Sequence, residues 1–192
     1  MGELDIIMEC KTSSYPQFSA CGLNCGLCPR YYTVGSSMCP GCMGEGFSGV
    51  HPSCGVLSCC QRKGFERCFE CSEFPCKKYE NADKTDSFIT HKNQFRDIEK
   101  ARRDFNAYKA ELNVKIQILQ ELLTGFDDGR HKSFYCLAIN LLELKDIHLI
   151  RGYIGNHVDL QATLQEKAKT LAILFQAMAD EKEIVLKLRK QA

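Results

Sequence analysis

The chain has 192 residues, 13 cysteines and a formal net charge of +1. A hydrophobic share of 44% is sufficient for a packed core and excludes an intrinsically disordered chain. No stretch approaches the roughly 18 consecutive apolar residues of a membrane helix, and residues 1–10 lack the pattern of a secretory signal. We therefore expect a cytoplasmic protein without membrane association, in which thiols stay reduced and available to metals.

The first eighty residues differ in composition from the rest of the chain. Leu4, Ile6 and Met8 alternate with other residues, which predicts one short strand near the N-terminus. From residue 19 to residue 76 the segment is rich in glycine and proline, which oppose long regular elements. Such a segment buries little apolar surface and needs cross-links or metals to fold. We therefore predict a loop-rich, cysteine-rich metal-binding module over residues 1–80 and an all-helical domain over residues 81–192.

Helix formers dominate after residue 77, and apolar residues recur there at helical spacing. The pattern predicts helices over residues 87–103, 104–123, 132–144 and 159–189, so the fold class is mainly α. Gly125 lies where a helix-terminating glycine is expected. The last helix approximates a heptad repeat, but Lys167 and Glu181 interrupt its apolar seam. We expect this helix to pack on its own bundle, with a homodimer through it as the alternative.

Eleven of the 13 cysteines lie between residues 21 and 76, at spacings that are typical of metal sites. A CxxC turn places two sulfurs near the edge length of a tetrahedron around zinc, and a second pair completes the four ligands. The first two CxxC pairs have the proportions of a zinc ribbon, although pairing between the two groups of cysteines stays open. The predicted ligands are Cys25, Cys28, Cys39 and Cys42 for one ion, and Cys59, Cys68, Cys71 and Cys76 for the other, with Cys54 as the alternate.

Zinc is the favoured metal, with two ions per chain, because structural zinc supplies folding free energy to a segment with little core. Thiolates also hold iron–sulfur clusters, and Cys21, Cys25 and Cys28 have the CxxxCxxC spacing of radical S-adenosylmethionine enzymes. Those enzymes need a large α/β barrel, whereas helices follow here without strand–helix alternation. An iron–sulfur cluster is therefore the alternative, and a disulfide scaffold is a further one.

Several other cysteines and one histidine fall outside this ligand set. Cys10 and Cys136 are expected to be plain thiols, and Cys136 lies near an apolar helix face. Cys60 directly follows the predicted ligand Cys59 and is left out of the ligand set, because two adjacent residues do not readily bind the same ion. Cys21 remains open between a metal ligand, a resolving thiol and a buried structural residue. His51 lies among the ligands and is a candidate replacement for a cysteine.

A second dense group of polar residues lies between two predicted helices. In the structural interpretation, a glycine ends one helix and an aspartate or a serine begins the next. In the functional interpretation, Arg130 and Lys132 form an anion-binding site beside a helix N-terminus, and Asp127 or Asp128 serves as a general base. If this turn folds against the cysteine-rich module, the two would form one site. Basic residues at 77–78 and 100–103 alternate with acids, which favours a solvated face over a nucleic-acid surface.

The residues around the cysteines resemble a known family. The stretch CGLNCGLCP over residues 21–29 is similar to the opening of the cysteine-rich domain-of-unknown-function family 3795. The run over residues 54–76, which includes CFEC and EFPC, resembles its second half. The motif FDDGRHKSFYC over residues 126–136 resembles a part of the helical extension of longer members. The resemblance covers about residues 19–145 and implies a zinc-binding protein without an established activity, with Cys60 as a departure at a position where a small residue is usual.

We accordingly expect a zinc-binding protein, rather than an enzyme, whose module presents a surface to a protein partner or, less favoured, to a nucleic acid. One alternative is an iron–sulfur or thiol redox enzyme that uses Cys21 and a neighbouring cysteine. Another alternative is a metal or redox sensor, in which loss of a labile site is transmitted to the helical domain.

Overall fold

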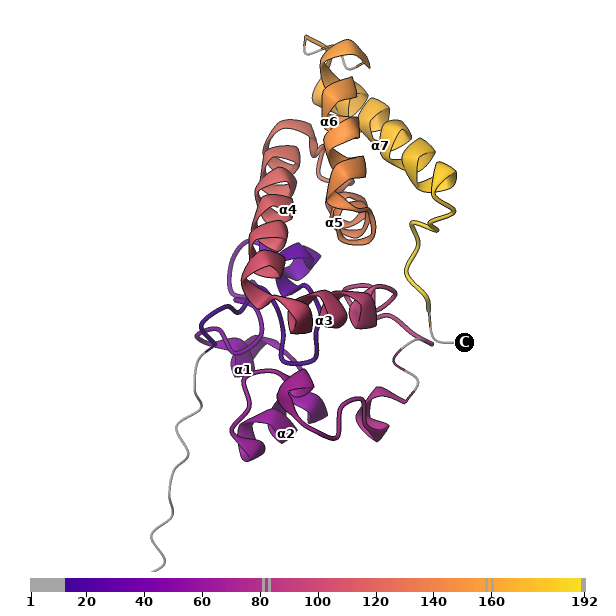
Figure 1. Ribbon diagram of the computed structural model, residues 1–192. Coiled ribbons are helices and arrows are strands. Elements are labelled where there is room, and N and C mark those ends of the chain that lie inside the picture. The colour runs from indigo at the N-terminus through magenta and orange to yellow at the C-terminus, as the bar shows by residue number, and fades with distance from the viewer. Residues whose placement is uncertain (1–12, 81, 83, 158, 160, 191–192) are drawn as a thin grey trace, which may run out of the picture.

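The computed structural model describes residues 13–80, 82, 84–157, 159 and 161–190, so the strand predicted near the N-terminus, Cys10 and Leu160 lie outside the described residues. Within them the regular structure is entirely helical, which confirms a mainly α fold in which a cysteine-rich segment precedes the long helices (Figure 1). The helices are α1 (Phe47–Val50), α2 (Gly55–Lys63), α3 (Gln94–Arg103), α4 (Phe105–Phe126), α5 (Lys132–Leu141), α6 (Leu144–His157) and α7 (Leu164–Glu181).

The cysteine-rich segment is built from tight turns, the two short helices α1 and α2, and short 3₁₀ helices. At Gly41 the backbone has a φ of +88°. A β-carbon there would lie 2.3 Å from the carbonyl oxygen of Pro16, so the close approach of the two chain segments requires glycine. The next residue, Cys42, donates its N–H to the same oxygen at 3.0 Å. The 3₁₀ helices are η1 (Cys25–Leu27), η2 (Pro29–Tyr32), η3 (Cys68–Glu70) and η4 (Lys77–Tyr79).

Helix α4 is the axis around which the other long helices are arranged. It contacts η1, α3, α5 and α7. In Figure 1, α5, α6 and α7 gather at the opposite end of the molecule from α1 and α2. A single hydrophobic core joins the two parts, since Phe18 and Leu27 of the cysteine-rich segment belong to the same buried cluster as Leu112 and Leu119 of α4. In the described part of the chain, no helix combines the length and apolar character needed to cross a membrane.

Two of the predicted helix boundaries in the middle of the chain are wrong. Helix α3 begins at Gln94 instead of residue 87, because the segment before it is held in turns by Asp86, whose carboxylate accepts the His91 N–H at 2.7 Å. Helix α4 continues through Gly125 to Phe126, so this glycine does not end the helix. The positive-φ glycine of this region is Gly129, with a φ of +86° in the following turn.

The C-terminal third of the chain differs more from the prediction. The chain turns at Leu142 and begins α6 at Leu144, a helix that was not predicted. The interior glycines Gly152 and Gly155 lower its helix propensity, whereas Ile147 is fully buried and anchors it to the core. Helix α6 therefore owes its stability to tertiary packing.

Helix α7 is shorter than the predicted range of residues 159–189. Thr163 forms a capping box with Glu166 at its start. After Glu181 the chain leaves the helix, and Glu183 adopts a φ of 55°. Leu171 and Phe175 of α7 are buried, and the helix contacts α4, α5 and α6, so it packs on its own bundle as expected. The homodimer through this helix stays a prediction.

The chain after α7 returns to the start of α3, as Figure 1 shows. Arg189 donates from its guanidinium to Asp86 Oδ1 at 2.7 Å and from its backbone N–H to Asp86 Oδ2 at 2.7 Å. Lys92 donates to the carbonyl oxygens of Val185 (2.7 Å) and Lys187 (2.9 Å). Burial by itself would raise the pKa of Asp86, but the hydrogen bonds from Arg189 and His91 hold the pKa below its usual value.

We expect Asp86→Asn to lower the free energy of unfolding at neutral pH by about 2 kcal/mol, because it weakens charge-assisted hydrogen bonds to a fully buried carboxylate. The pKa of Asp86 is lower in the folded chain, so its contribution is complete above the unfolded pKa of about 3.9 and is lost as the pH falls through the folded pKa. Urea unfolding of the parent chain and of Asp86→Asn, at neutral pH and below about pH 3, measures the difference in the free energy of unfolding. Asp180→Asn, at an exposed position, is the control. A difference between Asp86→Asn and the parent that does not shrink in acid would contradict the expectation.

Candidate metal centre

The cysteines of the module fall into groups in space. Burial has the largest effect on the pKa of these thiols and raises it. Within a group, the negative charge of one thiolate raises the pKa of a neighbouring thiol further. The first group contains Cys21, Cys25, Cys28, Cys39, Cys42 and Cys54, and the second contains Cys59, Cys60, Cys68 and Cys76. Cys42 also raises the pKa of Cys60, so the two groups adjoin.

Cys21, Cys25 and Cys42 of the first group all have raised pKa values. Burial raises the pKa of Cys21 to about 11; the Ser19 hydroxyl opposes this shift and Cys54 adds to it. Burial raises the pKa of Cys25 well above its usual value, and Cys42 and Cys21 raise it further. Burial likewise raises the pKa of Cys42 to about 12, with contributions from Cys21 and Cys54. Cys21, for which the spacing left three roles open, therefore lies among predicted ligands, and Cys54 lies with the first group.

Backbone amides surround several of these sulfurs. Burial is the largest influence on each pKa, but the amide of Cys42 lowers the pKa of Cys25, and the amide of Ala20 lowers the pKa of Cys42. The amides of Arg30 and Tyr31 act in the same way on Cys28. Hydrogen bonds of this kind favour the thiolate over the thiol. The thiolate is the form that binds a metal.

The second group lies around helix α2 and the turn that follows it. Cys60 and Cys68 are buried, with exposed fractions of 2% and 6%. Cys71 lies beside Lys63, whose ammonium group is 3.6 Å from the Cys71 sulfur and 2.9 Å from a Glu73 carboxylate oxygen. The predicted ligands of the second ion thus come from α2 and from the chain that passes alongside it.

The twelve described cysteines form no disulfide. Among the described residues, no three Cys, His, Asp or Glu side chains are arranged so that they could hold a metal ion as they stand. The ligand set therefore stays a prediction, and binding would require the thiols to turn toward common centres. The His51 ring stacks on Phe47 at a centroid distance of 4.6 Å, and its Nδ1 lies 2.8 Å from the Pro52 carbonyl oxygen. Cys136 is 1% exposed and belongs to the core, as expected.

The turn that carries the first two cysteines is attached to the helices by a buried polar network. Asn24, in the sequence CGLNC, donates from Nδ2 to Asp97 Oδ2 of α3 (2.8 Å) and to Asn140 Oδ1 of α5 (3.0 Å). The Tyr108 hydroxyl of α4 donates to Asn24 Oδ1 at 2.6 Å. Asn93 donates to Asp97 and to both oxygens of Asn140. One side chain of the module therefore bonds to three helices at once.

The charges near this network follow from burial. Burial raises the pKa of Asp97, although Lys115 and Arg96 oppose the shift. Burial lowers the pKa of Lys115, with Asp97 opposing, and Lys115 Nζ donates to the Leu142 carbonyl at 2.7 Å. This network was not predicted from the sequence. The pattern that indicates it is a pair of polar residues, Asp97 and Asn140, on the apolar faces of their helices.

A further set of contacts holds the backbone of Cys21. Gln94 Nε2 donates to the Cys21 carbonyl at 2.7 Å, and the Tyr79 hydroxyl lies 3.2 Å from the same oxygen. Gly22 has a φ of +88°, and a β-carbon there would come within 2.2 Å of Ile98 on α3. Only glycine allows the turn to lie this close to the helix.

The turn between α4 and α5 is organised by its aspartates. Asp127 Oδ1 accepts the N–H groups of Gly129 and His131 at 3.1 Å each. Asp128 Oδ1 accepts the N–H of Arg130 at 3.0 Å and lies 2.7 Å from His131 Nδ1. The structural interpretation is wrong in detail, because α4 passes through Gly125 and α5 begins after His131 without a side-chain cap. The aspartates hold the turn itself instead. An anion site at Arg130 and Lys132, and a general base at Asp127 or Asp128, stay predictions.

We expect Asn24→Ala to lower the free energy of unfolding by about 3 kcal/mol, because it leaves the buried Asp97 carboxylate and the Asn140 amide short of partners. Urea unfolding followed by circular dichroism measures the change. Asn106→Ala, at an exposed position on α4, is the matched control and should change stability by less than about 0.5 kcal/mol. Equal effects of the two substitutions would contradict the role of the network.

Comparison with known proteins places the cysteine-rich segment in a family. Residues 17–81 match the family model described as "Protein of unknown function (DUF3795)". No curated protein and no solved structure matches the chain. The matched range includes all eleven clustered cysteines, Asn24 and Tyr79, whereas α3 and the helices after it lie outside it. The match confirms the resemblance to this family over residues 17–81, whereas the resemblance of the motif at residues 126–136 stays a prediction.

Proposed function

We propose that the module binds two zinc ions through its two groups of thiols and acts as a metal-stabilised unit held on the helical bundle. The observation that carries this proposal is the gathering of reduced cysteines into two groups within one short segment. A zinc site of four thiolates is closed and structural, which fits a protein without a catalytic role.

For the first ion, the ligands that we favour are Cys21, Cys25, Cys42 and Cys54. In addition to burial, Cys21 and Cys54 both raise the pKa of Cys42, and Cys42 and Cys21 both raise the pKa of Cys25. Three of the four thiols lie beside backbone amides. They replace the zinc-ribbon set predicted from spacing, which used Cys28 and Cys39. For the second ion we retain Cys59, Cys68, Cys71 and Cys76.

The thiols fit zinc chemically, because a metal ion balances the negative charge of thiolates that are buried close together. In the metal-free chain Cys25, Cys42 and Cys68 are protonated at neutral pH, since burial raises the pKa of each. Zinc displaces those protons, so its affinity must fall as the pH falls. Zinc binding contributes about 10–16 kcal/mol to the folding of small zinc domains, which is enough to order a segment built mainly of turns.

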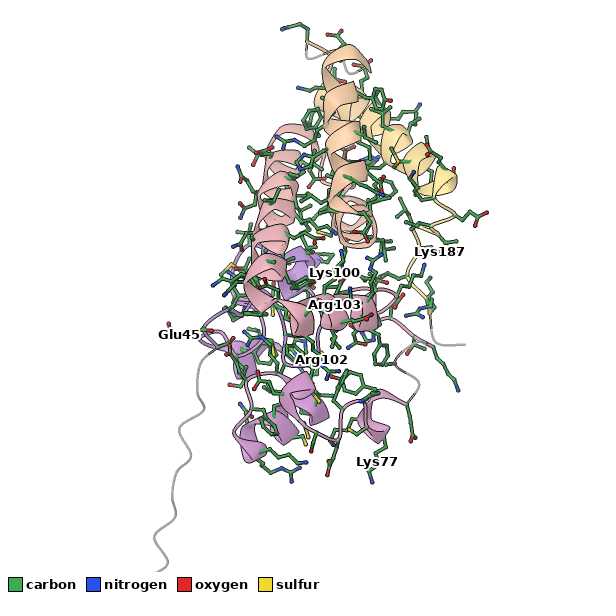
Figure 2. The ribbon with its side chains drawn as sticks, in the orientation of Figure 1. Glu45, Lys77, Lys100, Arg102, Arg103 and Lys187 are labelled. Carbon is green, nitrogen blue, oxygen red and sulfur yellow. The ribbon has the colours of Figure 1, made fainter. Side chains whose placement is uncertain are left out.

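We further propose that the module and α3 together present a surface to a protein partner. The Phe95 ring is 43% exposed, and the half-buried Phe74 ring lies 6.3 Å from it. The Arg102 guanidinium lies 5.9 Å from the Phe74 ring centroid. Figure 2 shows Arg102 on α3 and Lys77 in the module. Exposed aromatic rings beside arginine are typical of protein interfaces.

We expect protein purified without oxygen to be colourless and to contain about two zinc ions per chain by elemental analysis. Cys21→Ser and Cys54→Ser should each reduce this to about one ion, because each removes a ligand of the first site. Cys28→Ser and Cys136→Ser should leave the content unchanged.

Loss of an ion in Cys28→Ser and Cys39→Ser, but not in Cys54→Ser, would instead support the zinc-ribbon set. A brown protein with bound iron would overturn the zinc proposal and favour an iron–sulfur cluster. A chain that binds no metal would overturn both.

A further inference from the structure

A small cavity lies where α5 meets the cysteine-rich segment and the chain that follows α7. Its volume is about 50 Å³. Ser133, Cys136, Leu137 and Asn140 line it from α5, and their spacing of three and four residues places them on one face of that helix. The other walls come from η1, η2, the segment before α3 and the chain after α7. Ser133 and Phe88 are exposed lining residues, so the cavity is accessible from the surface.

Asn140 brings a buried hydrogen-bond donor to this cavity. The residue is only 1% exposed. Its Oδ1 atom accepts from Asn24 Nδ2 and from Asn93 Nδ2, at 3.0 Å each. Because two N–H donors meet this atom, it is the oxygen of the amide, and the other atom is the nitrogen. Within the described part of the chain, no residue accepts a hydrogen bond from Asn140 Nδ2.

Thr90 brings a second buried donor from the segment before α3. The residue is 2% exposed and lines the same cavity. Its Oγ1 atom accepts the Lys92 N–H at 3.2 Å, and its own O–H has no acceptor among the described residues. A buried donor without an acceptor is destabilising, so two of them at one cavity indicate an acceptor atom that enters it.

We propose that this cavity binds the acetyl group of a neutral amide, whose carbonyl oxygen accepts from Asn140 and Thr90. A cavity of about 150 Å³ holds benzene, with its six heavy atoms, so about 50 Å³ has room for roughly two or three. A methyl carbon and a carbonyl group fill this space. The apolar side chains of Leu27, Ile89 and Leu188 line it and suit the methyl group.

The lining distinguishes this ligand from a water molecule and from a carboxylate. Water satisfies the two donors but leaves the apolar walls without contacts. None of the described lining residues is charged, so a carboxylate would lose its hydration without gaining a cation. The cavity also contains no proposed zinc ligand, so this inference is independent of the two-zinc proposal.

The test measures binding to the full-length chain by ligand-observed NMR, with N-methylacetamide as the probe and acetate as its charged counterpart. The parent chain should bind N-methylacetamide saturably and acetate at least about 10-fold more weakly. Thr90→Val should weaken the binding of N-methylacetamide about 5-fold, because it removes one hydrogen bond and keeps the shape of the side chain. Leu188→Phe should abolish it, because the larger ring fills the cavity. Thr124→Val, at an exposed position on α4, is the matched control and should bind as the parent does.

A short peptide that carries an acetylated lysine distinguishes the two sources of such a group. Tighter binding of this peptide than of N-methylacetamide would identify an acetylated side chain as the ligand. Equal or weaker binding of the peptide would identify a small free amide.

A parent chain that shows no saturable binding of N-methylacetamide would overturn the inference and leave a cavity that holds water only. Tighter binding of acetate would overturn it as well, and so would equal binding of N-methylacetamide by the parent, Thr90→Val and Leu188→Phe. Circular dichroism of each variant checks that the helices remain folded. Leu188→Phe lies outside the long helices, so it keeps the test decisive if Thr90→Val unfolds.

Discussion

The amide side chain of Asn24 is the contact on which the arrangement of the two halves depends. The cysteine-rich segment has no long helix or sheet with which to pack against a bundle, so it needs directional bonds for its orientation. Asn24 supplies them by donating to Asp97 and Asn140 and accepting from Tyr108. A buried amide is costly unless fully bonded, so other orientations of the turn are disfavoured. The helices thereby hold the backbone from which Cys21 and Cys25 project.

Apolar packing and hydrogen bonding have different roles in placing the module on the helices. Phe18 and Leu27 bury the module against α4 without selecting a direction, whereas hydrogen bonds select one. The same division holds inside the module, where the Ala20 carbonyl oxygen accepts the Cys68 N–H. In both places a polar atom at the centre of a packed region determines how the surrounding chain is oriented.

Local patterns were sufficient for the helical class and for the start of α4, because apolar spacing and an N-cap aspartate act within a few residues. Local patterns did not predict α6, because tertiary packing overrides the low helix propensity of its glycines. They also failed at Gly125, which helix propensity alone places at the end of a helix. Cysteine spacing identified the segment in which the thiols gather. It could not identify which thiols meet, because the approach of Cys42 to Cys25 depends on a contact between distant turns at Pro16.

The tail after α7, residues 182–190, returns to Asp86, and this return affects the order of folding. The bonds between Asp86 and Arg189 join residues separated by 103 positions in sequence, so they close a very long loop and are expected to form late. Segments that join last are also among the first to open in the native state. The tail forms part of the lining of a cleft, together with Lys92, Asn93 and Arg96. Its opening would admit water to Asn93, and through Asn93 to the network that orients the cysteine turn.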